Sequence, residues 1–320
     1  MIKKTKTYLL LSLSFVFCTF NNANAQCCGA GNPVSGFGNV SGIPYKTLLV
    51  GAKYKYSYSD QYYTGAEKTD ISPDKSYYNF IGIDVSYGIT NRLSVQGNVG
   101  YFINKAKIYN IEGWSPMKGY GLGDAEINVK YTVVKRILKK LDIIPGAGIK
   151  LPIGVFDQVV DDVKLPISLQ PSSGSLKYNF NIFIFKGFKK HSISFRAMAE
   201  FANRIVSEHF DYKYGNFYLV SIYGSFNINK TFSALSQLRF EYRGNSIREN
   251  QQIVESSGGQ AAYFIPQINI MPAHNIGISV YADIPVYRYM NGTQLANKFA
   301  ISVKLTKSFN FNKKVEYKEL

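Results

Sequence analysis

The sequence contains few of the residue types that build metal sites and disulfide frameworks. It has three cysteines and three histidines among 320 residues. Cys18 lies in an apolar N-terminal stretch, and Cys27 and Cys28 form an adjacent pair. Two adjacent thiols cannot supply the four ligands of a structural zinc site, nor a framework of several disulfides. The sequence therefore predicts no metal and no cofactor, and it leaves open whether the pair is reduced, bonded to each other or lipid-modified.

Long apolar runs are also missing. After residue 25 no segment approaches the roughly 18 consecutive apolar residues that a membrane-spanning helix needs. The one apolar run, Tyr8 to Phe20, is short, follows the basic start MIKKTK and precedes Ala23-Asn24-Ala25. This order is typical of a secretory signal peptide. We expect residues 1–25 to be removed after Ala25; the alternative is a retained N-terminal helix.

Acidic residues are outnumbered. The chain carries 37 Lys and Arg against 21 Asp and Glu, a net charge of +16. Because residues 1–25 contain three lysines and no acid, the mature chain remains basic. The basic residues are spread along the sequence rather than gathered in one patch, which argues against nucleic-acid binding and favours lipid head groups or anionic solutes as partners.

What the sequence does contain suits strands and turns. There are 25 Tyr, 22 Phe and 27 Gly, and aromatic and β-branched residues favour pleated sheets. Between Ile81 and Ile89 apolar residues alternate with Gly82, Asp84, Ser86 and Gly88, and a similar run follows from Leu93 to Ile103. Only Thr90-Asn91 separates the two runs, which predicts a tight hairpin.

The same unit recurs down the chain. The expected strands are 47–59, 77–89, 92–108, 121–135, 141–154, 175–188, 191–204, 216–228, 231–245, 258–271, 275–290 and 294–309. The connections alternate between long ones after odd-numbered strands and short ones after even-numbered strands; the last long position, near Asn291-Gly292, is short. Such alternation is typical of outer-membrane barrels, with long loops outside and turns in the periplasm.

We therefore predict an all-β fold, a single antiparallel transmembrane β-barrel of about 12 strands, in the bacterial outer membrane. The expected organisation is a signal peptide (1–25), a periplasmic N-terminal segment (26–46), the barrel (47–309) and a polar tail (310–320). A soluble β-sandwich or lipocalin-like barrel is the alternative. Twelve strands make a cylinder too wide for side chains to fill, which favours the membrane barrel with a polar, wet interior.

The start CCGAGNPVSG, the barrel pattern and GLGDAEINVKY (residues 121–131) resemble the outer-membrane barrels grouped under the name MetA-pathway of phenol degradation. Separately, the strand from Phe299 to Leu305, followed by Phe309 and Phe311, resembles the amphipathic, aromatic-ending strand that outer-membrane insertion machinery recognises. The resemblance implies an outer-membrane channel or transporter-like protein with no catalytic residues.

If the apolar face is turned toward lipid, the opposite face lines the lumen. The candidate lumen residues are Lys53, Lys55, Asp84, Glu126, Lys130, Arg196, Glu200, Arg239, Glu241, Arg243, Asp283 and Lys304. Lys150 and Lys177 share this face, so basic side chains outnumber acidic ones. An open interior would favour anions, whereas ion pairs across the lumen could instead serve only to hold the barrel in shape.

No enzyme site is expected. His191 and His274 border predicted turns and His209 lies in a predicted outer loop, so no histidine is placed to activate a serine at lipid level. The tyrosines at positions 54, 56, 58, 62, 63, 77 and 78 suit an aromatic girdle at the membrane interface.

The expected function is a channel for small solutes, anionic or aromatic. The alternative is a structural or adhesive barrel with partner-binding outer loops and a lumen occluded by Val155 to Gly174.

Overall fold

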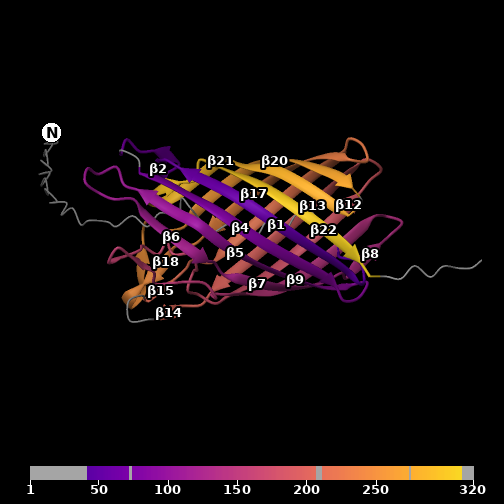
Figure 1. Ribbon diagram of the computed structural model, residues 1–320, viewed down its shortest axis with the longest axis horizontal. Coiled ribbons are helices and arrows are strands. Elements are labelled where there is room, and N and C mark those ends of the chain that lie inside the picture. Colours follow the sequence, from indigo (N-terminus) through magenta and orange to yellow (C-terminus); the bar gives the residue numbers. More distant parts are fainter. Residues whose placement is uncertain (1–41, 72–73, 207–210, 274, 312–320) are drawn as a thin grey trace, which may run out of the picture.

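The computed structural model describes residues 42–71, 74–206, 211–273 and 275–311, and these form one closed antiparallel barrel of twelve strands. The ribbon view shows the wall strands crossing the long axis obliquely (Figure 1). The ring closes where β1 pairs with β22 and where β20 pairs with β21. Among the described residues no helix is long and apolar enough to cross a membrane. The predicted fold class is therefore confirmed.

The wall strands are β1 (Thr47–Ser59), β4 (Lys75–Gly88), β5 (Leu93–Ile108), β7 (Ala125–Tyr131), β9 (Leu141–Leu151), β12 (Lys177–Gly187), β13 (His191–Ala202), β16 (Phe217–Asn227), β17 (Phe232–Arg243), β20 (Gly259–Ala273), β21 (Ile276–Ala296) and β22 (Phe299–Asn310). Each pairs with its sequence neighbour, as tight turns at one end demand. The first strand begins and ends where the alternation predicts.

Shorter elements lie toward the ends of the wall strands. They are β2 (Gln61–Gly65), β3 (Glu67–Lys68), β6 (Met117–Leu122), β8 (Val134–Arg136), β10 (Val159–Val160), β11 (Val163–Lys164), β14 (Ile205–Val206), β15 (Asp211–Lys213), β18 (Ser246–Arg248), η1 (Glu249–Gln251) and β19 (Gln252–Val254). Strands β14, β15, β18 and β19 form a separate small sheet. This sheet, hereafter the loop sheet, lies at the end of the barrel that carries the long loops, on the left of Figure 1.

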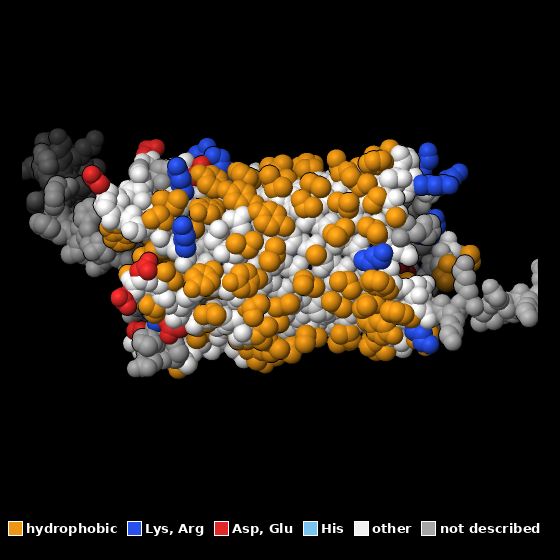
Figure 2. Space-filling view, viewed as in Figure 1, with side chains coloured by type: hydrophobic (Ala, Val, Ile, Leu, Met, Phe, Trp, Pro, Cys, Tyr) orange, Lys and Arg blue, Asp and Glu red, His pale blue; other side chains and the backbone are white. Residues whose placement is uncertain are grey.

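The two faces of the wall differ as the alternation predicts. On β4, Ile81, Ile83 and Val85 are exposed, and Ile83 keeps 54% of its surface, whereas Asp84 and Ser86 on the opposite face are buried. Figure 2 shows the same pattern over the visible wall, with apolar side chains along its length and charged ones mainly at the ends. An apolar outer belt around a polar interior is the arrangement of a barrel that spans a bilayer.

The last outer connection differs from its prediction. Strand β21 does not turn at Asn291-Gly292 but continues to Ala296, and the turn is Asn297-Lys298. Gly292 adopts a φ of 60°, and around it the register with β2 shifts by a bulge between Thr64 and Gly65. An Asn-Gly pair is a strong turn signal, yet here it bends a strand that continues beyond the wall to pair with β2.

The predicted strand 121–135 is interrupted. Its outer part is β6, and the wall continues as β7 from Ala125 and β8 from Val134. Gly121 has a φ of 133°, a conformation that side chains disfavour. The break releases Asp124 from the sheet, and this residue takes on a separate role at the barrel mouth.

Of the seven tyrosines predicted to form an interfacial girdle, Tyr78 and Tyr62 lie elsewhere. Tyr54 is exposed on the outer face, and Tyr56 and Tyr77 lie together there with ring centroids 6.4 Å apart. Tyr78, one position on, is buried inside with its ring edge-on to Phe102. Tyr62 packs against Leu295 above the wall. Strand parity explains why Tyr78 faces inward, because neighbouring residues on a strand face opposite sides.

Candidate functional site: the barrel interior

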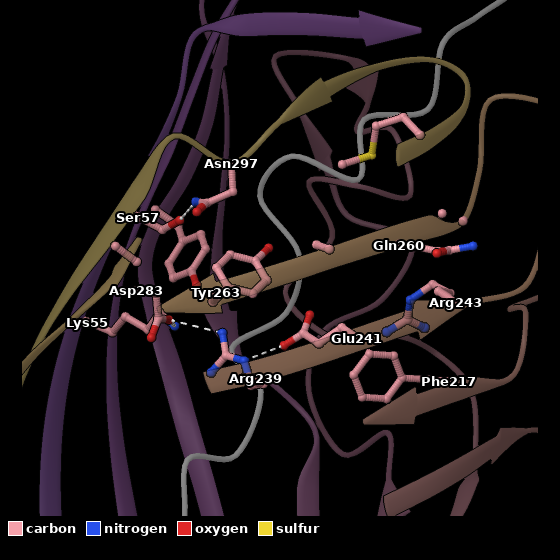
Figure 3. A pocket seen from close by; sticks show the side chains of 16 residues that line it. Lys55, Ser57, Phe217, Arg239, Glu241, Arg243, Gln260, Tyr263, Asp283 and Asn297 are labelled. Carbon is pink, nitrogen blue, oxygen red and sulfur yellow. Dashed lines mark hydrogen bonds and ion pairs between the residues drawn. The ribbon is translucent and has the colours of Figure 1, made fainter. Parts of the chain in front are cut away.

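The charged candidates from the sequence all occupy positions that are buried or half-buried on the interior register of the wall. The structure gathers five of them, Lys55, Arg239, Glu241, Arg243 and Asp283, around one pocket in the interior (Figure 3). The pocket has a cavity volume of about 140 Å³. The others lie in two groups elsewhere on the inner wall.

Asp283 is the centre of the ion pairs in this pocket. Its Oδ2 lies 2.6 Å from the Lys55 Nζ and 3.5 Å from a terminal nitrogen of Arg239. The Nε of Arg239 lies 2.8 Å from Oε1 of Glu241. Two acids therefore neutralise two bases, and these contacts join β1, β17 and β21. The sequence predicts that these side chains face inward, but it could not show which of them pair.

Two arginines of the pocket are stacked on aromatic rings. The guanidinium carbon of Arg239 is 4.7 Å from the ring centre of Tyr263, and that of Arg243 is 4.7 Å from the ring centre of Phe217. Stacking holds the planar guanidinium in one orientation and leaves its N–H edge available. Phe217 and Tyr263 are therefore site residues that charge alone did not reveal.

A second group joins the strands from β7 to β13. The carboxylate of Glu200 forms an ion pair with Lys150 and lies 3.8 Å from the Nζ of Lys177. Glu126 accepts hydrogen bonds from the amides of Asn128, at 2.6 Å, and Asn179, at 3.1 Å. The group thus balances two acids against two lysines, with one acid between the lysines and the other held by amides.

The remaining candidates lie on the inner wall outside the pocket. Lys304 pairs with Asp84 at 2.9 Å, and the Nζ of Lys53 lies 5.3 Å from the ring centre of Phe80. Lys130 is half-buried and Arg196 is buried on the same interior register.

An aromatic cluster also faces the interior. Tyr78, Phe80 and Phe102 pack together, with the Phe80 and Phe102 rings 5.0 Å apart. A Cβ at Gly100 would lie 2.0 Å from the Phe80 ring, so only glycine leaves room for this ring. Phe80 shares strand parity with Gly82 and Asp84, and this parity was the signal that could have placed it inside. The interior thus carries apolar as well as charged side chains, and β4 contributes both.

The chain between β9 and β12, residues 152–176, reaches across the barrel mouth and is called here the cover loop. Leu165, Leu169 and Gln170 are buried. The Nζ of Lys105, from the inner face of β5, donates to the carbonyl oxygen of Gln170 at 3.2 Å. Ile167 packs with residues of the loop sheet. The cover loop therefore contacts the inner face of β5 on one side and the loop sheet on the other.

Asp124 fixes the C-terminal part of the cover loop. Its carboxylate accepts hydrogen bonds from the Ser172 hydroxyl at 2.7 Å, and from the Ser173 backbone N–H at 2.9 Å and hydroxyl at 2.6 Å. This is the aspartate of the GLGD motif. The motif thus breaks a wall strand and presents a carboxylate to the loop, a role that the sequence pattern did not predict.

Another carboxylate fixes the outer rim. Asp74 accepts hydrogen bonds from the Tyr62 hydroxyl at 2.5 Å and the Asn110 backbone N–H at 3.1 Å, and it pairs with Lys107 at 2.9 Å. Partial burial alone would raise the Asp74 pKa, but these donors outweigh it and hold the pKa below its ordinary value. The carboxylate therefore stays ionised in mildly acidic surroundings.

Only one of the three histidines lies in the part of the chain that the structure describes. His191 stacks on Phe188 at the end of a turn, and His209 and His274 lie outside the described residues. No group of three His, Cys, Asp or Glu side chains there could hold a metal ion.

Comparisons with known proteins agree with the fold. No known protein family matches the sequence, and no curated protein matches it either. The structure is similar to an outer-membrane channel, called COG4313, from Pseudomonas putida F1, with a TM-score of 0.70, 13% identity, and coverage of 85% of this chain and 98% of that one. It is also similar to the transport unit of the autotransporter AIDA-I from Escherichia coli, with a TM-score of 0.51, 9% identity, and coverage of 87% and 94%.

These neighbours and the apolar belt identify the fold as that of a bacterial outer-membrane barrel. No family model confirms the resemblance to the MetA-pathway group. The structural neighbours support the broader likeness to outer-membrane channel barrels.

Proposed function

We propose that this chain is an outer-membrane channel for small solutes whose interior prefers anions to cations. The observation that carries the proposal is the charged inner wall, where three groups of ion pairs leave a surplus of basic side chains beside a pocket of about 140 Å³. Fixed charges of one sign along a pore select for solutes of the other sign.

A hydrated interior also agrees with the unpaired polar atoms of the inner wall. The Ser86 hydroxyl and the Gln96 side-chain oxygen, neighbours across β4 and β5, are buried and have no hydrogen-bond partner among the described residues. Buried polar atoms of this kind are normally satisfied by water. In a dry, packed core these two oxygen atoms would stay without a hydrogen bond, which is energetically unfavourable. A water-filled lumen supplies the missing partners.

Channel recordings test the proposal directly. Purified protein inserted into a planar bilayer should give discrete conductance steps in potassium chloride. A preparation that is folded, as judged by its electrophoretic mobility with and without heating, and yet never conducts would contradict a channel.

The cover loop favours a second candidate, an occluded barrel whose outer loops bind a partner. Its contacts with Lys105, Asp124 and the loop sheet would then close the mouth permanently. The channel and the occluded barrel predict different effects on conductance when the cover loop is released. Substitution of Asp124, which holds the loop, is the way to release it.

Replacing Asp124 by Ala is expected to increase the single-channel conductance severalfold. The change removes three hydrogen bonds to a carboxylate, and hydrogen bonds to charged groups contribute about 1.5–3 kcal/mol each. The released loop should leave the mouth wider. Asp161→Asn is the matched control, because Asp161 is exposed in the β10–β11 turn of the same loop. If both variants conduct like the unmodified protein, the cover loop does not limit the pore.

A further inference from the structure

The pocket has an uneven balance of charge. Its lining contains three bases, Lys55, Arg239 and Arg243, and two acids, Glu241 and Asp283. The acids lie against Lys55 and Arg239, at the distances given above. One positive charge therefore remains, and it belongs to Arg243.

The guanidinium of Arg243 is held in place but forms no ion pair. It stacks on the ring of Phe217, and no side-chain hydrogen bond joins it to any of the residues that the structure describes. The carboxylate of Glu200 attracts it at longer range, but that carboxylate already lies between Lys150 and Lys177. A guanidinium has five N–H donors in a planar fork. In Figure 3 the fork of Arg243 lies between Phe217 and Gln260, at the edge of the pocket. The arrangement presents a forked donor to any anion that enters.

The shape of that donor selects a carboxylate. Two parallel N–H groups of a guanidinium match the two oxygens of a carboxylate. Glu241 and Asp283 already neutralise the other two bases of the pocket, so a second negative charge on the ligand would have no base to balance it. A singly charged anion therefore fits better than a phosphate or a dicarboxylate.

The rest of the lining suits an apolar body. Phe217, Tyr263 and Met290 contribute apolar surface, and Ser57, Gln260 and Asn297 contribute polar groups. A cavity of about 140 Å³ is close to one that accepts a single benzene-sized ring. The pocket thus suits a ligand whose body is about the size of one ring.

We infer that this pocket binds a small organic monocarboxylate, with its carboxylate held by the guanidinium of Arg243 and its body against Phe217 and Tyr263. The inference rests on the proposed channel function and names the class of solute that the lumen recognises.

Benzoate is the probe and benzamide its uncharged counterpart of the same shape. Calorimetric titration of the folded protein in detergent should show saturable binding of benzoate and at least about tenfold weaker binding of benzamide, since a charge-assisted hydrogen bond is replaced by a neutral one. Equal binding of the two probes, or no binding of benzoate, would overturn the inference.

Three variants locate the contact. Arg243→Gln should weaken benzoate binding about tenfold or more, and Arg243→Lys should recover only part of the loss because it keeps the charge without the fork. The control is Arg288→Gln, since Arg288 also stacks on a ring, that of Tyr63 at 4.6 Å, and does not line the pocket. Unchanged binding in Arg243→Gln, or equal loss in the control, would contradict the assignment.

Folding and conduction are measured separately on each preparation. A channel that conducts without binding benzoate overturns this inference alone. A protein that binds benzoate through Arg243 and never conducts overturns the channel proposal alone.

Discussion

Replacing Asp283 by Ala should destabilise the barrel more than any other single change to the pocket. Asp283 is only 3% exposed and is the anion nearest to both Lys55 and Arg239. Removing one partner of a buried ion pair costs about 3–5 kcal/mol because a charge is left uncompensated. Water in the lumen screens part of this effect, so we expect the free energy of unfolding to fall by about 3 kcal/mol, near the lower end of that range.

Urea titration followed by electrophoretic mobility measures this loss. Adding Lys55→Met to Asp283→Ala should restore part of the stability, because Arg239 then keeps Glu241 as its partner and no lysine is stranded. Asp60→Ala serves as the control, since Asp60 pairs with the exposed Lys298 at the rim and should change little. If Asp283→Ala behaves like the control, the ion pairs of the pocket do not hold the wall together.

A charged side chain on the outer face should impair the barrel nearly as much as Asp283→Ala does. Ile83 lies near the middle of β4 with its side chain exposed on the apolar belt. An arginine at the midplane of a barrel's lipid face costs about 2–4 kcal/mol. Ile83→Arg is therefore expected to reduce the fraction of protein that folds into lipid vesicles, measured by the same mobility shift.

The matched control is Asn98→Arg. Asn98 pairs in register with Asp84, next to Ile83, so it lies at the same depth, and its amide donates to Glu126 on the inner face. An arginine there has water and a carboxylate for partners, and insertion should stay close to that of the unmodified protein. Equal loss in both variants would show that the two faces of the wall are assigned wrongly.

Much of the wall could be predicted from strand parity. Ile83 and Asp84 face opposite sides because side chains alternate along a strand, and the same rule places Lys55, Arg239 and Asp283 inside. Their pairing could not be predicted, because Lys55 and Asp283 are 228 positions apart and meet only through the register of β1, β22 and β21. The stacking of Arg243 on Phe217 depends on the register of β16 and β17 in the same way.

The ends of the barrel were harder to predict than its wall. The Asn291-Gly292 pair has the composition of a turn, but β21 keeps its pairing by a bulge and turns at Asn297, whose amide bonds to the Ser57 hydroxyl at 2.7 Å. The inward course of the cover loop depends on Asp124, which is far from it in sequence. Contacts between distant segments decide both features, and local patterns do not contain them.

The preference for anions can be measured as a zero-current potential. With the protein in a planar bilayer between concentrated and dilute potassium chloride, the zero-current potential reports which ion crosses more readily. We expect the sign set by chloride, and a smaller magnitude for Arg243→Gln than for Arg288→Gln, because Arg243 carries the unneutralised charge of the pocket. A potential of the sign set by potassium would contradict the preference for anions.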